Sequence, residues 1–225
     1  MTRRLISAAS LLLIALYGGA SAQSSDAPEI RASFDSYRAA VRSGNWAEAA
    51  ELVDAEAVAV FERVRDAALH ADKAELLRSE FWISAAALVL RHVASAEEIE
   101  AATGRAAYAL ASRTSPFPPI DPQVIEIGPV RVANGGAAAT APIVHNGQRT
   151  DYIMRFVRED GRWRIAWSPL FANATVELET QLGITPRTPA DVREIVIERD
   201  MFHILRDGTR REVSQSIWQP LKARR

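Results

Sequence analysis

The chain has 225 residues and a nearly balanced charge, with 27 lysine and arginine residues against 28 aspartate and glutamate residues. Such a chain has no overall electrostatic attraction for nucleic acid or anionic lipid, so neither is an expected partner. The absence of cysteine excludes disulfides, metal thiolates and cysteine nucleophiles. Packing alone must therefore hold the fold together.

The N-terminus has the pattern of a cleavable secretory signal peptide. Arg3 and Arg4 precede the apolar run 5–17, and small residues follow up to Ala22. A membrane anchor is the alternative, but a bilayer span needs about 20 apolar residues and this run is shorter. We therefore expect residues 1–22 to be removed, which leaves an exported protein, periplasmic or extracellular, without membrane attachment.

Helical periodicity and capping residues predict that the first half of the mature chain is helical. Asp26 with Glu29, and Asn45 with Glu48, form capping pairs three residues apart. Apolar residues then recur at spacings of three and four. The predicted helices cover residues 26–44, 45–54, 55–70, 73–93, 95–103 and 105–113.

The predicted helix 73–93 is apolar around most of its circumference, which indicates burial on most sides. Only Glu80, Ser84 and Arg91 form a narrow polar stripe. His92 lies in the last turn, where the helix C-terminus favours a protonated imidazole. A histidine that packs in the core or caps the helix is the favoured interpretation, and an acid–base role is the alternative.

The pattern changes to β-structure after a linker with four prolines between residues 116 and 122. Glycine-containing turns then separate four predicted antiparallel strands, at 123–132, 137–145, 150–158 and 162–168. Alternation predicts one apolar, largely aromatic face turned toward the helices. This face consists of Ile125, Ile127, Tyr152, Met154, Phe156, Trp163, Ile165 and Trp167.

The C-terminal residues predict further helices and one short strand. A helix is expected at 169–182, and Thr188 with Pro189 begins another, although a strand at 193–205 is the alternative. A short edge strand is expected at 212–218, before Pro220. The segment from Thr188 onward either packs on its own core or docks on a partner.

Two motifs resemble the nuclear transport factor 2-like superfamily, whose members share a cystatin-like curved sheet. They are the corner Ser43-Gly44-Asn45-Trp46 between two helices, and the hairpin that ends in Gly161-Arg162-Trp163-Arg164-Ile165. The stretch 63–92 and the Ile217-Trp218 ending also resemble an exported bacterial branch, for which no particular activity is implied.

The resemblance implies an α+β fold in which a helical N-terminal half packs in the concave face of a curved four-stranded antiparallel sheet. The implied organisation is a domain at 23–183 followed by a C-terminal extension at 184–225. In this superfamily the outer sheet face is a common dimer surface. Ile153, Val157 and Ala166 would leave apolar area there, so the resemblance implies a homodimer.

Enzymes of this superfamily, such as isomerases, dehydratases and hydrolases, keep a buried carboxylate or imidazole inside the cone. The strands place no carboxylate on the inward face, because Glu126 and Asp151 have the outward parity. They lie beside Arg131, Arg155 and Arg164, so surface ion pairing is favoured over an anion site. The weak catalytic candidates are therefore His92 and Tyr152.

Asp66 and His70 stand four residues apart on one helix, a spacing that would suit a base and its orienting carboxylate. Both lie opposite the apolar arc, so solvation is expected. No two histidines have the close spacing of a zinc pair, and no cofactor-binding motif occurs. We therefore expect neither a metal nor a cofactor.

Five aromatic residues would line a pocket for a small apolar ligand, or would simply pack the core: Tyr37, Trp82, Tyr152, Trp163 and Trp167. Since fold alone does not decide function, the sequence favours an exported module that binds a small ligand or an envelope protein. A small-molecule isomerase, dehydratase or hydrolase is the alternative.

Overall fold

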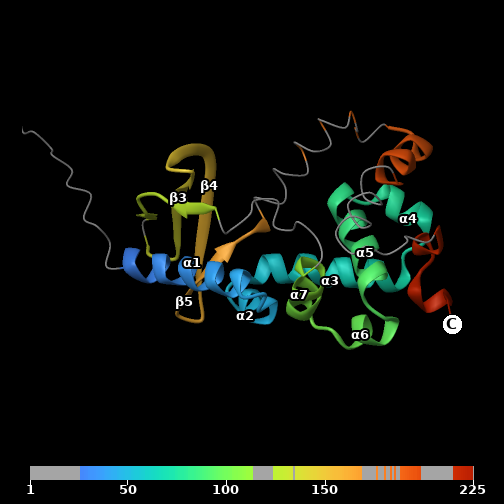
Figure 1. Ribbon diagram of the computed structural model, residues 1–225, viewed down its shortest axis with the longest axis horizontal. Coiled ribbons are helices and arrows are strands. Elements are labelled where there is room, and N and C mark those ends of the chain that lie inside the picture. Colours follow the sequence, from blue (N-terminus) through green and yellow to red (C-terminus); the bar gives the residue numbers. More distant parts are fainter. Residues whose placement is uncertain are drawn as a thin grey trace, which may run out of the picture.

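The computed structural model describes residues 26–113, 124–133, 135–168, 188–198 and 215–224, together with single positions at 176, 180, 183 and 185. The molecule is elongated, with a curled antiparallel sheet at one end and a helical bundle at the other (Figure 1). Helix α1 lies on the sheet, and α3 extends away from it into the bundle. The α+β class and the packing of helices on a curved sheet are thus as predicted.

The helices of the first half begin and end close to the predicted positions. Their bounds are α1 Ala27–Arg42, α2 Trp46–Glu51, α3 Ala55–His70, α4 Lys73–Arg78, α5 Phe81–Val93, α6 Ala96–Ala101 and α7 Gly104–Ser112. Asn45 caps α2 as expected, because its side chain accepts a hydrogen bond from the Glu48 N–H. Among the described residues, none of these helices is both long and apolar enough to cross a bilayer.

The prediction of a capping pair at Asp26 was wrong. The Asp26 side chain makes no capping hydrogen bond to α1. It accepts instead from the Arg158 guanidinium at 3.4 Å, and Glu29 lies 3.7 Å from the same group. Arg158 comes from the sheet, so these contacts attach the first turn of α1 to the strands below it, and this long-range pairing replaces the local cap.

The prediction of a single helix over residues 73–93 is also wrong, because the helix is interrupted at Ser79, between α4 and α5. Ser79 is extended, and its hydroxyl donates to the Glu75 carbonyl at 2.9 Å. The Ser84 hydroxyl donates to the Leu76 carbonyl at 2.5 Å and so ties α5 back to α4. Serine competes in this way for backbone groups that would otherwise continue a helix.

The expected polar stripe of α5 is not a solvated face. Ser84 is fully buried and Arg91 is only 4 % exposed. The Arg91 guanidinium donates to five carbonyl oxygens, those of Ala67, Ala68 and Ala71 at the end of α3, and those of Ile217 and Trp218 near the C-terminus. Arg91 therefore satisfies the carbonyls at the negative end of α3 and holds the C-terminal segment against it.

The sheet has the strand order β1-β3-β4-β5, with β2 beside β3 at the same edge as β1, and all pairs are antiparallel. The bounds are β1 Ile125–Ile127, β2 Arg131–Val132, β3 Ala138–His145, β4 Gln148–Glu159 and β5 Arg162–Ala166. The predicted strand 123–132 is thus divided in two. At the division the Gly128 N–H donates to the Pro142 carbonyl at 2.8 Å, and a Cβ on Gly128 would lie 2.7 Å from the Pro142 ring.

The inward face of the sheet packs on α1 through aromatic contacts. The rings of Phe34 and Phe156 meet edge to face at 6.4 Å, and those of Tyr37 and Trp167 lie 5.6 Å apart. The predicted inward residues are buried, with one exception. Tyr152 is 39 % exposed although it has the inward parity, so it is not buried with the other residues of this face. It lies on β4 beyond the part of the strand that carries the buried Met154 and Phe156.

The described part of the C-terminal segment belongs to the helical core. Residues 190–198 form a helix, as the start at Thr188 predicts, while 199–205 and most of the predicted helix 169–182 lie outside the described residues. The predicted edge strand is wrong, because Gln215–Trp218 is a 3-10 helix, η1, followed by a second, η2, at Leu221–Arg224.

The buried side chains of this segment are Val196, Ile197, Ile217, Trp218 and Leu221, and they join the same core as α3 and α5. The described residues of the C-terminal segment therefore pack on their own chain, which contradicts the docking-arm alternative for this part of the segment.

Candidate functional site

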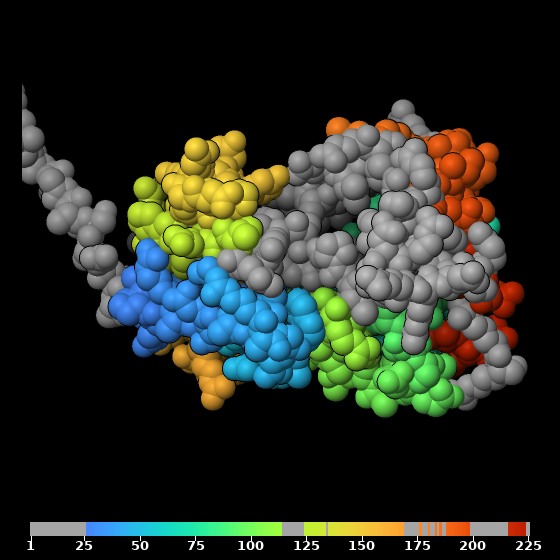
Figure 2. Space-filling view, in the orientation of Figure 1, coloured from blue at the N-terminus to red at the C-terminus, as the bar shows by residue number. Residues whose placement is uncertain are grey.

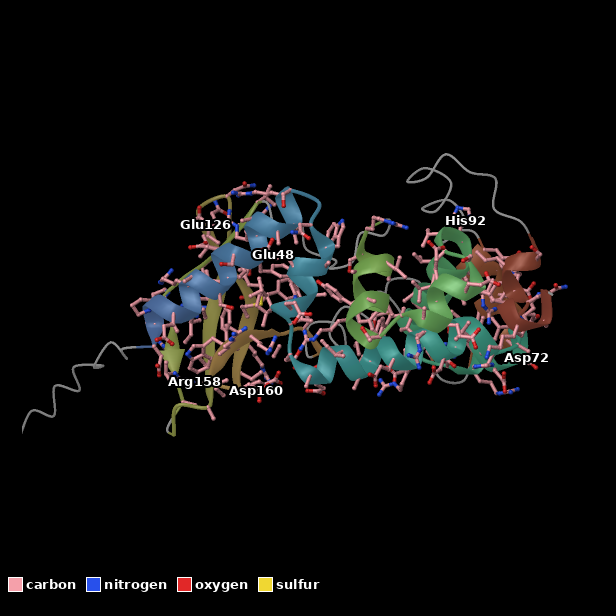
Figure 3. All side chains as sticks on the ribbon, turned by 90° about the horizontal axis from the view of Figure 1, so that it is seen from below. Glu48, Asp72, His92, Glu126, Arg158 and Asp160 are labelled. Carbon is pink, nitrogen blue, oxygen red and sulfur yellow. The ribbon has the colours of Figure 1, made fainter. Side chains whose placement is uncertain are left out.

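The structure does not bring the two acid–base candidates together. His92 lies on α5 in the helical bundle, at the opposite end of the molecule from Glu126 and Arg158 of the sheet (Figure 3). Tyr152 lies on β4, within that sheet. A general acid and base must both reach one substrate, so His92 and Tyr152 do not form a shared site.

The other four aromatic candidates are buried, but they do not share one site. Tyr37 and Trp167 pack on each other between α1 and the end of the sheet. Trp82 packs on Phe61 at 5.8 Å in the helical bundle. Trp163 is buried on β5, with the Arg158 guanidinium 5.7 Å from its ring centre. Burial of this kind is what the core-packing alternative predicts for these residues.

Asp54 is a buried acid that strand alternation could not predict, because it lies outside the strands, directly before α3. Its side chain is 2 % exposed and accepts hydrogen bonds of 3.3 Å from the backbone N–H groups of Ala57 and Trp167. The backbone of residues 52–54 runs parallel to β5, since the Asp54 N–H donates to Ile165 and the Ile165 N–H donates to Leu52. This pairing places the carboxyl group beside the end of β5, where the Trp167 N–H reaches it.

Burial raises the pKa of Asp54 to about 6, against the lowering effect of its two backbone hydrogen bonds. The carboxylates of Glu159 and Glu56 also raise the pKa of Asp54. Glu159 itself accepts from the Ala55 N–H at 3.0 Å and lies 3.4 Å from Arg164. Two carboxylates, the buried Asp54 and Glu159, therefore accept hydrogen bonds from N–H groups at the N-terminus of α3.

The sequence did contain a signal for Asp54, because an aspartate directly before a predicted helix is a typical N-cap. That signal predicts that the Asp54 carboxylate caps the helix while exposed to solvent. The burial arises from the parallel pairing of residues 52–54 with β5, which no local pattern indicates.

A second buried polar pair joins α1 to α7. The hydroxyl groups of Tyr37 and Tyr108 are 2.8 Å apart, and both side chains are buried. Burial raises the pKa of Tyr108 to about 12 and that of Tyr37 well above its ordinary value, so both hydroxyls stay neutral near pH 7. The pair holds the helices together and carries no charge.

A groove of about 690 Å³ lies between the α1–α2 corner and helices α6 and α7. On the face shown in Figure 2, the light-blue surface of α2 borders the yellow-green surface of α7. The apolar lining comes mainly from Trp46, Ala47 and Ala50 on one wall and from Ala106, Ala109 and Leu110 on the other. Small-molecule sites have volumes of about 300–1,000 Å³ and a mostly apolar lining, so this groove has the size and composition of such a site.

The two walls of the groove are held together by Arg105. Its guanidinium donates to the carbonyls of Ala50 and Val53, and its Nε lies 3.7 Å from the Glu51 carboxylate. These contacts satisfy the end of α2 and use much of the donor capacity of Arg105. Arg105 is therefore a positioning residue of the groove.

Arg113, which also lines the groove, has a different environment. It stands eight residues after Arg105, so about 12 Å separates their positions along α7. Within the described residues, its guanidinium makes no ion pair shorter than 4 Å. The positive charge of Arg113 acts on the Glu98 carboxylate, which accepts a hydrogen bond from the Ser95 N–H at 2.7 Å. The charge of Arg113 thus remains available at the end of the groove.

The remaining ionisable candidates are at the surface. Asp66 and His70 are exposed, as expected, and Asp66 pairs with Arg65 at 2.9 Å. Glu126 and Asp151 are exposed too, and Arg164 pairs with Glu159. Within the described part of the chain, no three histidine, aspartate or glutamate residues are grouped closely enough to hold a metal ion.

Comparisons with protein-family models, with curated proteins and with solved structures found no match to this chain.

Proposed function

We propose that this protein is an exported small-ligand-binding module and that its ligand occupies the groove between α2 and α7. The observation that carries the proposal is the groove itself, about 690 Å³ in volume with Trp46 and alanine side chains along its walls. The signal-peptide pattern of residues 1–22 supports export. A helical half followed by an antiparallel meander supports membership of the nuclear transport factor 2-like superfamily.

The groove is a better site than the interior of the sheet because the aromatic side chains there already touch one another. Tyr37 and Trp167 are in ring contact, and both are fully buried. Neither lines the α2–α7 groove. A ligand in the cone would have to displace this packing, whereas a ligand in the groove would cover surface that is open to solvent.

Catalysis is not proposed, because the two carboxylates among the groove-lining residues are already engaged: Glu51 lies beside Arg105, and Glu98 belongs to the capping box of α6. Asp54 titrates near neutral pH but does not line the groove, and its carboxyl group bonds to backbone N–H groups. His92 and Tyr152 lie on α5 and β4, which are not walls of the groove. Binding is the function that this geometry supports best.

The test uses the neutral fluorescent probe N-phenyl-1-naphthylamine with the mature protein. We expect saturable fluorescence enhancement and a loss of affinity of at least about tenfold in Ala109→Trp, because the indole would occupy part of the space between the two walls. The matched control is Ala32→Trp, which places the same side chain at an exposed position of α1 that does not line the groove. Equal binding by both variants, with unchanged Tm, would refute the α2–α7 site.

A further inference from the structure

If the groove is the ligand site proposed above, we infer further that its ligand is an amphipathic anion, an apolar chain or ring that carries one acidic group. The apolar body would lie between Trp46 and the alanines of α7, and the acidic group would meet Arg113. This assignment concerns the chemical class of the ligand, whereas the proposed function concerns only the place where it binds.

The apolar part of the inference follows from the apolar side chains on the two walls of the groove. Trp46 is half-buried, and Ala47, Ala50, Ala106 and Ala109 have no polar side-chain atom to offer a ligand. A polar ligand body would lose its hydration there without gaining hydrogen bonds from these side chains. An apolar body instead gains free energy in proportion to the apolar area that it buries.

The anionic part follows from how the four charged side chains of the groove are engaged. Arg105 is hydrogen-bonded to carbonyls and lies near Glu51, so this pair is largely compensated. The Glu98 carboxylate forms a capping box with Ser95 at the start of α6, and this hydrogen bond holds the pKa of Glu98 below its usual value. Arg113 is the groove charge for which the described residues supply no close counter-ion.

A guanidinium group favours carboxylate, sulfonate or phosphate oxygens because its planar donors bind two of them at once. An ammonium head group placed at the same point would meet like charge. The groove therefore discriminates between ligands that share an apolar body but differ in head group, and this difference can be measured directly.

The experiment measures how decanoate, decan-1-ol and decylammonium displace N-phenyl-1-naphthylamine from the mature protein at pH 7.5. We expect decanoate to bind about tenfold more tightly than decan-1-ol, and decylammonium to bind most weakly. In Arg113→Gln, decanoate should fall to the affinity of decan-1-ol, and the affinity of decan-1-ol should not change. Arg63→Gln is the matched control, because it removes an exposed arginine of α3 that does not line the groove.

Equal affinities for the three head groups, or a preference for decylammonium, would overturn the anionic assignment and leave the groove as an apolar site. Failure of all three to displace the probe, together with insensitivity to Ala109→Trp, would overturn the proposed function instead. Raising the salt concentration should reduce the advantage of decanoate over decan-1-ol, since the Arg113 contact is exposed to solvent.

Discussion

At the scale of single residues, the least expected feature is the burial of charged side chains in a protein without disulfides. Asp54 and Arg91 are almost completely inaccessible to solvent, and each bonds to backbone groups at opposite ends of α3. The carboxyl group receives N–H donors at the N-terminus, and the guanidinium group donates to carbonyls at the C-terminus. Both match the sign of the helix dipole, so α3 is stabilised at each end by a side chain of the appropriate charge.

Asp54 should make stability depend on pH. Its folded-state pKa of about 6 lies above its ordinary value of 3.8, so between these values the folded state binds more protons than the unfolded state. The free energy of unfolding contributed by Asp54 is therefore highest below about pH 4 and is lost as the pH rises through 6. Asp54→Asn removes this dependence and keeps an oxygen acceptor for Ala57 and Trp167.

We expect the stability of Asp54→Asn relative to the natural protein to increase by roughly 2–3 kcal/mol between pH 4 and pH 7. Urea unfolding at a series of pH values measures this difference directly. Subtraction of the two curves cancels the contributions of carboxyl groups that both proteins share. A difference that stays constant over this range would show that Asp54 titrates normally.

At the scale of elements, the C-terminal helices are part of the fold. Trp218, Ile217 and Leu221 are buried against α3 and α5, and the indole N–H of Trp218 donates to Glu198 at 3.1 Å. A chain that ends at Gly183 would expose this part of the core and leave Arg91 without two of its carbonyl partners. We expect this truncation to lower Tm by well over the roughly 2–4 °C that accompanies each 1 kcal/mol in a chain of this size.

The companion variant for the truncation is Arg91→Met, which keeps the chain length but removes a donor from five carbonyl groups, three of them in buried hydrogen bonds. We expect it to lower the free energy of unfolding by about 3 kcal/mol. Arg63→Met, on the exposed side of α3, is the control and should have little effect. An unchanged Tm in the truncated protein would show that the segment contributes nothing to the core.

At the scale of the whole molecule, we propose that two copies associate through the outer face of the sheet. Ile153 is 39 % exposed and Val157 is partly exposed there, whereas Ala166 is buried and adds little surface. Ile153→Arg should therefore convert a dimer into a monomer, because it places a charge in the middle of the contact. Sedimentation of the mature protein and of the variant measures the mass, and a monomeric natural protein would contradict the proposal.

The sequence by itself determined the local features of this protein. Short-range hydrogen bonds and apolar periodicity define the ends of α1, α2, α3, α6 and α7 to within three residues, and turns at Asn146-Gly147 and Asp160-Gly161 define the two hairpins. Alternation along β4 and β5 predicted the burial of Met154, Phe156 and Trp163. Each of these features depends on residues that are neighbours in the chain.

Only the tertiary structure decided the features that join distant segments. Asp54 is buried because residues 52–54 pair with β5, and Arg91 is buried because α3 and the C-terminus converge on it. The α2–α7 groove likewise combines residues near 50 with residues near 110. A sequence pattern reports the preference of each segment for water or for the core. It does not report which group of a distant segment a side chain will contact, because that depends on how the segments pack together.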